Sequence, residues 1–247
     1  MRRYLSVAGM MRLLISGFCA LAFWLLSSVA WADSILVQNA SFELVANPPG
    51  LNQTCAGTGC AFNDVANGPI PGWTPSFNAS AGSFQPGSST TYFNTALPDG
   101  NIVAYINSGS ISQTLGVSIL PDSIYTLSVD VGRRNDVAGV NYSLNLLAGS
   151  NAFCTQSGSN STIAAGTFSE ITLICTTGAS VPAGLLGIEL TGASRQVNFD
   201  DVQLSVTSAA VVTPEPGTLA LTFVSLLVGG LLFVRSRRNQ YLQSATS

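Results

Sequence analysis

Short runs of alternating or continuous apolar residues recur along the middle of the chain, and no stretch there has a convincing helical period. Such runs are typical of β-strands with at least one buried face. Turn sequences such as Pro98-Asp99-Gly100-Asn101 separate them, because proline fixes one turn dihedral and glycine permits a positive φ at another. The pattern predicts strands at Ile35–Val37, Ile102–Ile106, Ile124–Val131, Tyr142–Leu147, Phe168–Cys175, Leu185–Leu190 and Val197–Val206.

Many closely spaced strands without intervening helices predict an all-β fold, an antiparallel β-sandwich over residues 33–207. This length suits one domain with a substantial core. Residues 46–95 are rich in Gly, Pro, Ser and Asn and are expected to be irregular. Loops of that length are usually functional or held by disulfides.

The N-terminal residues have the pattern of an export signal. Arg2, Arg3 and Arg12 precede an apolar stretch from Leu13 to Leu26, and Ala30-Trp31-Ala32 places small residues where signal peptidase reads them. We therefore expect residues 1–32 to be a helical signal peptide and the mature chain to begin at Asp33.

The C-terminal residues combine three features in a fixed order. Pro214, Glu215 and Pro216 precede an uncharged apolar run, residues 217–234, and Arg235, Arg237 and Arg238 follow it. At about 1.5 Å per residue, a helix of that length crosses most of a hydrocarbon layer of about 30 Å. The arginines favour the cytoplasmic side. The expected arrangement is a linker at 208–213, a transmembrane helix at 217–234 and a short cytoplasmic tail at 241–247.

These three parts resemble the PEP-CTERM sorting signal, which here covers residues 214–240. The resemblance implies that a membrane-embedded exosortase cleaves near Pro-Glu-Pro and that the protein is then released or attached outside the cell. The precursor would be a single-pass protein of the inner membrane. An ordinary membrane anchor with a chance Pro-Glu-Pro is the alternative.

Charge and composition exclude several functions. Between Asp33 and Thr213 the sequence contains three arginines, no lysine and eleven carboxylates, which gives a net charge of −8. Such a domain lacks the basic surface that nucleic-acid binding requires. The chain has no histidine, so Ser-His-Asp, Cys-His and histidine-based metal sites are excluded. A glycosidase needs only two carboxylates, but no recognisable pair stands out, and we expect a protein that is not an enzyme.

Four cysteines remain once the signal peptide is removed, and an even number in an exported protein indicates disulfides. Four cysteines allow three pairings; we expect Cys55 with Cys60, closing a Gly-rich loop, and Cys154 with Cys175, tying two neighbouring strands across a polar turn around residues 158–166. A zinc site is the competing interpretation, but the spacings are not those of paired CxxC knuckles.

Four short motifs resemble, in their order, the galactose-binding-like jelly roll found in carbohydrate-binding modules. They are Leu36-Val37-Gln38-Asn39-Ala40-Ser41-Phe42-Glu43, Pro71-Gly72-Trp73, Ile111-Ser112-Gln113-Thr114-Leu115 and Val197-Asn198-Phe199-Asp200-Asp201-Val202-Gln203-Leu204. The resemblance implies that the opening and closing strands lie close together and that a structural calcium ion binds Glu43 and Asp200, with Asp201 a weaker candidate. Carboxylates with backbone carbonyls form the oxygen cage that calcium prefers. Otherwise these are solvated strand-end charges, with Arg195 as a partner.

A sugar site usually combines aromatic faces with groups that bond hydroxyls. We expect Trp73, Tyr92, Arg133 and Arg134 to contact a ligand, and the adjacent arginines suit an anionic sugar. The alternatives are that the aromatic residues belong to the core and that the arginines pair with Asp130 or Asp136. Further candidates are Phe77, Phe84, Phe93, Tyr105, Asn94, Asn101, Asn107 and Asn135.

The sequence thus predicts an exported protein of the cell envelope, cell surface or extracellular matrix that binds a polysaccharide or other glycan. The alternative is a structural surface or biofilm protein without a specific small ligand. A polysaccharide hydrolase is the third interpretation.

Overall fold

The computed structural model describes residues 32–46, 50–88, 90–208, 225–226 and 228–229, and the strands among them fill the region predicted to be β. One short 3-10 helix, η1 (Asn160–Thr162), lies between β9 and β10. The strands are β1 (Asp33–Ile35), β2 (Gln53–Thr54), β3 (Ala61–Asp64), β4 (Thr74–Pro75), β5 (Ser80–Gln85), β6 (Val103–Ser118), β7 (Ser123–Arg133), β8 (Asn141–Ala148), β9 (Asn151–Ser159), β10 (Thr167–Thr176), β11 (Leu185–Gly192) and β12 (Val197–Ser208).

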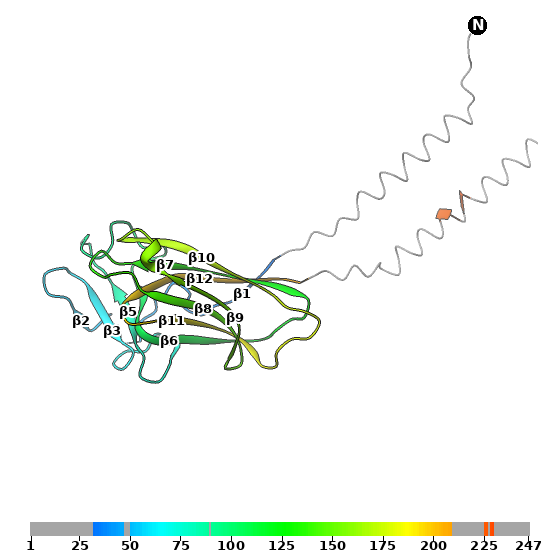
Figure 1. The fold of residues 1–247 in the computed structure, drawn as a ribbon, viewed down its shortest axis with the longest axis horizontal. Coiled ribbons are helices and arrows are strands. Elements are labelled where there is room, and N and C mark those ends of the chain that lie inside the picture. Colours follow the sequence, from blue (N-terminus) through cyan, green and yellow to red (C-terminus); the bar gives the residue numbers. More distant parts are fainter. Residues whose placement is uncertain (1–31, 47–49, 89, 209–224, 227, 230–247) are drawn as a thin grey trace, which may run out of the picture. The chain divides into compact units, whose positions relative to one another are not determined.

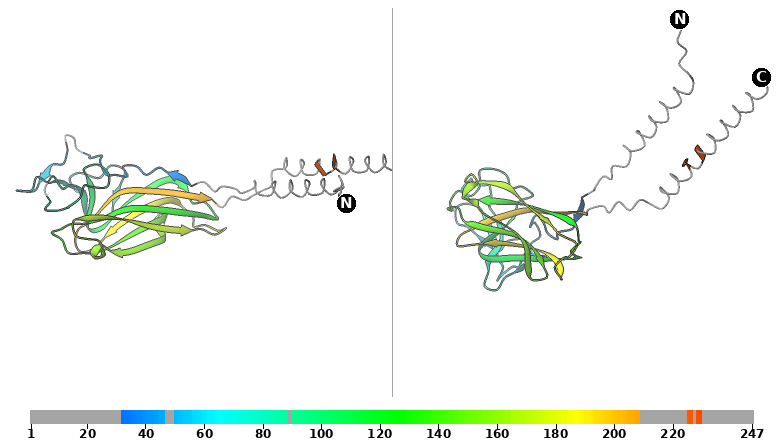
Figure 2. Two further views of the ribbon diagram at one scale, coloured as in Figure 1. Left: turned by 90° about the horizontal axis from the view of Figure 1, so that it is seen from above. Right: turned by 45° about the vertical axis from the view of Figure 1, so that its right-hand side comes forward.

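All strand pairs are antiparallel, and the principal order is β10-β7-β12-β6-β11-β8-β9. The long strand β6 belongs to two layers, because its first part pairs with β12 and β5 whereas residues 109–118 pair with β11. We call β10, β7, β12 and the start of β6 the β7 layer, and the rest of β6 with β11, β8 and β9 the β8 layer. The two layers face each other in Figures 1 and 2. The predicted antiparallel β-sandwich is therefore confirmed.

The main core lies between the layers, where alternate strand residues point inward. Leu127, Val131, Leu144, Ile188 and Phe199 are fully buried there. Burying each such side chain contributes about 1.5 to 3 kcal/mol. This core belongs entirely to residues of the sandwich, which form a unit separate from both chain ends. Residues 33–208 therefore have what an independently folding domain needs.

A second cluster of buried residues lies within the region expected to be irregular. It contains Cys60, Phe84, Tyr92, Phe93, Val103 and Tyr105. Here β3 pairs with β5 and β5 pairs with β6, so part of the predicted loop extends the sheet. The predicted disulfide Cys55–Cys60 closes a tight loop at this cluster.

The second predicted disulfide, Cys154–Cys175, is also confirmed. It joins β9 and β10, the strands at opposite ends of the principal strand order. The bond thus links the free edge of one layer to the free edge of the other, and the expectation that it ties two neighbouring strands across a turn is wrong, because β9 pairs with β8 and β10 pairs with β7. Strand β9 was not predicted, since its residues are polar and mostly exposed or half-buried.

The opening motif differs from the expected strand. Strand β1 ends at Ile35, and residues 38–41 form a turn; Asn39 within it and Phe42 directly after it adopt positive φ angles. The expected proximity nevertheless holds, because β1 pairs with β12 and the Val202 N–H donates to the Ala40 carbonyl. The first and last parts of the domain therefore lie side by side.

The predicted signal peptide, apart from Ala32, lies outside the described residues, as do Pro214, Glu215, Pro216, Arg235, Arg237 and Arg238. In the part of the chain that the structure describes, no helix has the length and apolar character needed to cross a membrane.

Candidate functional site

The aromatic residues considered for sugar contact differ sharply in exposure. Trp73, Phe84, Tyr92, Phe93 and Tyr105 are all buried, whereas Phe77 is 94% exposed. Trp73 packs against Phe42 with 5.3 Å between ring centroids, and its Nε1 donates to the Asn39 carbonyl. Its position is that of a core residue beneath the N-terminal turn, which corresponds to the alternative that the sequence left open.

Arg133 and Arg134 have different surroundings although they are adjacent. The Arg133 Nη1 donates to the carbonyls of Ser161 and Ile163, both at 3.1 Å, and so holds η1. Arg134 forms an ion pair with Asp136 and lies 4.3 Å from the centroid of the Tyr92 ring. The pairing with Asp136 that the sequence offered as the alternative is therefore present for Arg134.

Arg134 also lines a cavity of about 380 Å³ together with Asn107, Asp136, Val137, Ser194, Arg195 and Gln196. We call this the arginine cavity. Arg195, considered a partner for Glu43 or Asp200, lies here instead. Its guanidinium makes no ion pair with any described residue.

A row of hydroxyl-bearing residues crosses the outer face of the β8 layer. Ser110 on β6 is opposite Thr191 on β11, Thr191 is opposite Ser143 on β8, and Ser143 is opposite Ser157 on β9. We call these four residues the hydroxyl row. Since neighbouring strands are about 4.8 Å apart, the hydroxyls recur at nearly regular intervals.

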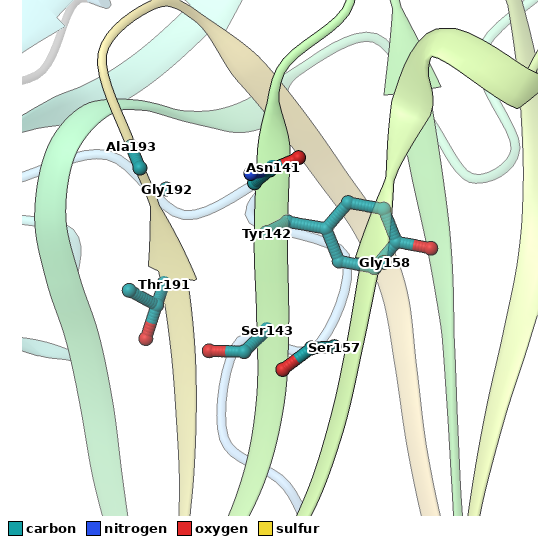
Figure 3. Close-up of a pocket in the computed structure, with 8 residues that line it drawn as sticks. All are labelled: Asn141, Tyr142, Ser143, Ser157, Gly158, Thr191, Gly192 and Ala193. Atoms are coloured by element: carbon teal, nitrogen blue, oxygen red, sulfur yellow. The ribbon is translucent and has the colours of Figure 1, made fainter.

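A hollow of about 470 Å³ lies over part of this row. Figure 3 shows Thr191, Ser143 and Ser157 side by side on three neighbouring strands. Their hydroxyls have no hydrogen-bond partner among the described residues. They are free to bind a polar ligand.

A second polar row runs beside the first, with Glu189 on β11 between Ser112 and Asn145. One oxygen of the Glu189 carboxylate accepts from Ser110 Oγ and the other from Asn145 Nδ2, both at 2.9 Å. These contacts fix an acceptor group in the middle of the face.

Phe77 lies at the β6 edge of the same layer. It follows Ser76, whose N–H donates to the Ser110 carbonyl, in the turn between β4 and β5. Phe77 is thus adjacent in sequence to the residue that binds Ser110, the first member of the hydroxyl row. Sequence reasoning grouped Phe77 with the buried aromatic residues because exposure cannot be read from residue type.

The proposed metal residues Glu43 and Asp200 contact one loop. Glu43 Oε1 accepts from the N–H groups of Asn101 and Ile102, at 2.7 and 2.6 Å, and Asp200 Oδ2 accepts from the Asp99 N–H at 3.1 Å. Gly100, with φ at 72°, has to be glycine because a Cβ there would lie 2.3 Å from the Glu43 carboxylate.

Asp200 is fully buried and has no cationic partner among the described residues. Burial raises the pKa of its carboxyl from 3.8 to about 7. The two backbone hydrogen bonds that the carboxylate accepts lower the pKa, and the negative charges of Asp99 and Asp201 raise it slightly. Both oxygens of the Asp201 carboxylate accept from Gln203 Nε2, at 3.0 and 2.9 Å. No three acidic or cysteine side chains within the described ranges cluster closely enough to hold a metal alone.

Comparison with known proteins gives the domain a family. The model of the HpiC1-like family, described as HpiC1 cyclase, matches residues 33–205. The Stig cyclase Fisc from Fischerella sp. TAU, solved in complex with (3Z)-3-(1-methyl-2-pyrrolidinylidene)-3H-indole, is 25% identical with a TM-score of 0.58 and covers 72% of this chain and 100% of its own. An apo cyclase from Fischerella sp. is 25% identical with a TM-score of 0.57, covering 73% and 98% respectively.

The CBM22-1 xylan-binding domain of Paenibacillus barcinonensis Xyn10C is 13% identical and covers 74% of this chain and 100% of its own, with a TM-score of only 0.43. That likeness is too low to bear on function. No curated protein matches the chain in sequence. Because the matched region takes in the whole sandwich from β1 almost to the end of β12, the chain belongs to the HpiC1-like family.

Proposed function

We propose that this chain is an exported protein whose β-sandwich binds polysaccharide on the outer face of the β8 layer. The observation that carries the proposal is the row of unpartnered hydroxyls on Thr191, Ser143 and Ser157 across three paired strands. Sugar chains present hydroxyls at regular intervals. Free hydroxyls and a fixed carboxylate on the protein can form hydrogen bonds with them, so the polar groups of both protein and sugar have partners.

Phe77 supplies the apolar element of such a site. A ring that is 94% exposed contributes nothing to the core. Aromatic faces cover the apolar side of a sugar ring while neighbouring polar groups bond its hydroxyls. The combination at one edge of the hydroxyl row favours a sugar chain over an isolated ion.

The experiment is binding of the purified 33–208 domain to a panel of bacterial and plant polysaccharides. Replacing Thr191 with Val, and Ser143 and Ser157 with Ala, removes three hydroxyls with little change in shape. We expect selective binding by the native domain and a loss of about tenfold or more in the triple variant, since each hydrogen bond contributes about 0.5 to 1.5 kcal/mol. The control is Thr172→Val, an exposed threonine on β10 of the other layer.

Failure of every polysaccharide to bind, with the domain folded, would remove the proposal and favour a structural role in the matrix. In that role the low charge and the polar surface would serve assembly. A hydrolytic activity is not part of the proposal, because Glu189 uses both oxygens to hold Ser110 and Asn145.

The proposal includes a structural calcium ion bound by Glu43 and Asp200. A fully buried carboxylate without a cationic partner is costly, and a divalent cation would offset that cost. Both side chains contact residues 99–102, so the remaining ligands would be backbone carbonyls. The ion would stabilise the loop and would take no part in ligand chemistry.

A second candidate function is binding of a planar aromatic molecule, as the Fisc complex with an indole compound suggests. One observation favours it: Asn198 is fully buried, and neither polar atom of its amide has a partner. Its neighbour Tyr105 belongs to the aromatic cluster. Calorimetric titration of the domain with the indole compound of the Fisc complex tests this second function. Heat of binding that vanishes in the Asn198→Leu variant would support the second function. Absence of any heat of binding would contradict it.

A further inference from the structure

The arginine cavity is unusual in the charge of its lining. Arg134 and Arg195 are two of the three cations between Asp33 and Thr213, yet both border a single space. Asp136 is the acidic residue among its lining residues, so the lining is net positive in a domain of net charge −8. The electrostatic potential in the cavity therefore attracts an anion, whereas the rest of the acidic surface repels it.

Arg134 is held in place before any ligand arrives. Its Nε and Nη2 donate to the two oxygens of Asp136, its Nη1 donates to Gln196 Oε1, and its guanidinium stacks over Tyr92. Three of its five N–H bonds are used in this way, and two remain. Because the side chain is already ordered, binding costs less conformational entropy than it would for a mobile arginine.

Arg195 is the opposite case, since it is exposed and makes no ion pair with any described residue. It follows Ser194, which has a φ of 70°, an uncommon value for a residue other than glycine. All five of its N–H groups can reach a ligand. The cavity thus offers one fixed and one adaptable guanidinium.

The arginine cavity adjoins the hollow over the hydroxyl row. Ala193 lines that hollow and the next residue, Ser194, lines the cavity. Both belong to the connection between β11 and β12. A bound chain that extends from the hollow along Ala193 and Ser194 would therefore meet the two arginines.

We propose that the arginine cavity binds the carboxylate of a uronic acid residue, so that the polysaccharide recognised by this domain is acidic. The inference rests on the proposed function. Guanidinium groups match a planar carboxylate in a bidentate geometry. A volume of about 380 Å³ is at the lower end of small-molecule sites and suits one sugar ring.

The test compares trigalacturonate with its fully methyl-esterified form, two probes that differ in charge and share their ring hydroxyls. Affinities for the 33–208 domain are measured by calorimetry at low and at moderate salt. We expect the acid to bind at least about tenfold more tightly than the ester, the order expected for one charge-assisted contact. The preference should decrease as salt is added.

Arg195→Gln is the decisive variant, because this exposed side chain can be replaced without disturbing the core. It should lower the affinity for the acid to that of the ester and leave the ester unchanged. Arg195→Lys should restore part of the preference, since it keeps the charge and loses the planar fork. The matched control is the Ser143→Ala variant, which should weaken acid and ester equally.

Equal affinities of acid and ester, or an acid preference that survives Arg195→Gln, would overturn the inference. Dextran sulfate is a further probe. If it binds as tightly as the acid and its binding is equally sensitive to Arg195→Gln, the cavity is a general anion site and the inference is also overturned. If neutral polysaccharides bind while trigalacturonate does not, the proposed function stands and the uronate site fails. If no polysaccharide binds, both fail.

Discussion

Glu43 and Asp200, which lie near opposite ends of the domain's sequence, bind the same four-residue loop through their carboxylates. Asp200 accepts from the N–H of Asp99, and Glu43 accepts from the N–H groups of Asn101 and Ile102. The loop leads directly into β6, the strand shared by both layers. These two side chains therefore connect the N-terminal turn and β12 to the centre of the sandwich.

If calcium binds at these residues, it should stabilise the folded domain. We expect the melting temperature of the 33–208 domain to rise with added calcium and to fall with a chelator, because a ligand that binds only the folded state stabilises it. Glu43→Gln should weaken this response, whereas Glu170→Gln, on β10, should leave it unchanged. Identical melting curves with calcium and with chelator would contradict the prediction.

The raised pKa of Asp200 predicts the pH dependence of stability when calcium is absent. The pKa of this carboxyl is about 7 in the folded protein and near its ordinary value of 3.8 when unfolded. Between these values the folded state binds the extra proton, so the free energy of unfolding should fall as pH rises from about 4 to about 7. Burial also raises the pKa of Asp130, which adds a change of the same sign.

Urea unfolding at a series of pH values with a chelator present measures this dependence. The Asp200→Asn variant, which cannot titrate at this position, should show a smaller slope over the same pH range. A native slope equal to that of the variant would show that Asp200 does not titrate as described.

Substitution of Trp73 should affect the stability of the domain, whereas substitution of Phe77 should affect polysaccharide binding. Trp73→Ala should lower the free energy of unfolding by about 3 to 5 kcal/mol, because it removes a buried ring packed on Phe42. Phe77→Ala should change it by no more than about 0.5 kcal/mol and should reduce polysaccharide binding. Chemical denaturation and the binding panel give both values. Full binding by Phe77→Ala would remove the ring from the proposed site.

Processing of the full-length chain tests the C-terminal signal. Replacing Glu215, or removing Arg235, Arg237 and Arg238, should leave an uncleaved precursor in the membrane fraction. Immunoblots of membrane and released fractions measure this, with a substitution within 241–247 as the control. Unchanged processing would contradict a sorting signal.

The apolar alternation in the sequence was sufficient to predict β7, β8, β10, β11 and β12, since each has a buried face in the main core. Both expected disulfides are also present, although four cysteines allow three pairings and the sequence alone does not select one. Strand β9 lacks apolar alternation, because it is an edge strand held by backbone pairing and by Cys154. Its pairing partner is β8, the strand directly before it in the chain, so backbone pairing rather than an apolar pattern of its own defines it.

The sequence alone determined the all-β class and the acidic charge of the domain, because these depend on the period of the apolar residues and on composition. Only the tertiary structure decided which groups meet a ligand. Arg133, the last residue of β7, and the adjacent Arg134 have different surroundings, while Arg134 and Arg195 share a cavity. Serine and threonine residues from four strands form one row only because the register of β6, β11, β8 and β9 aligns them.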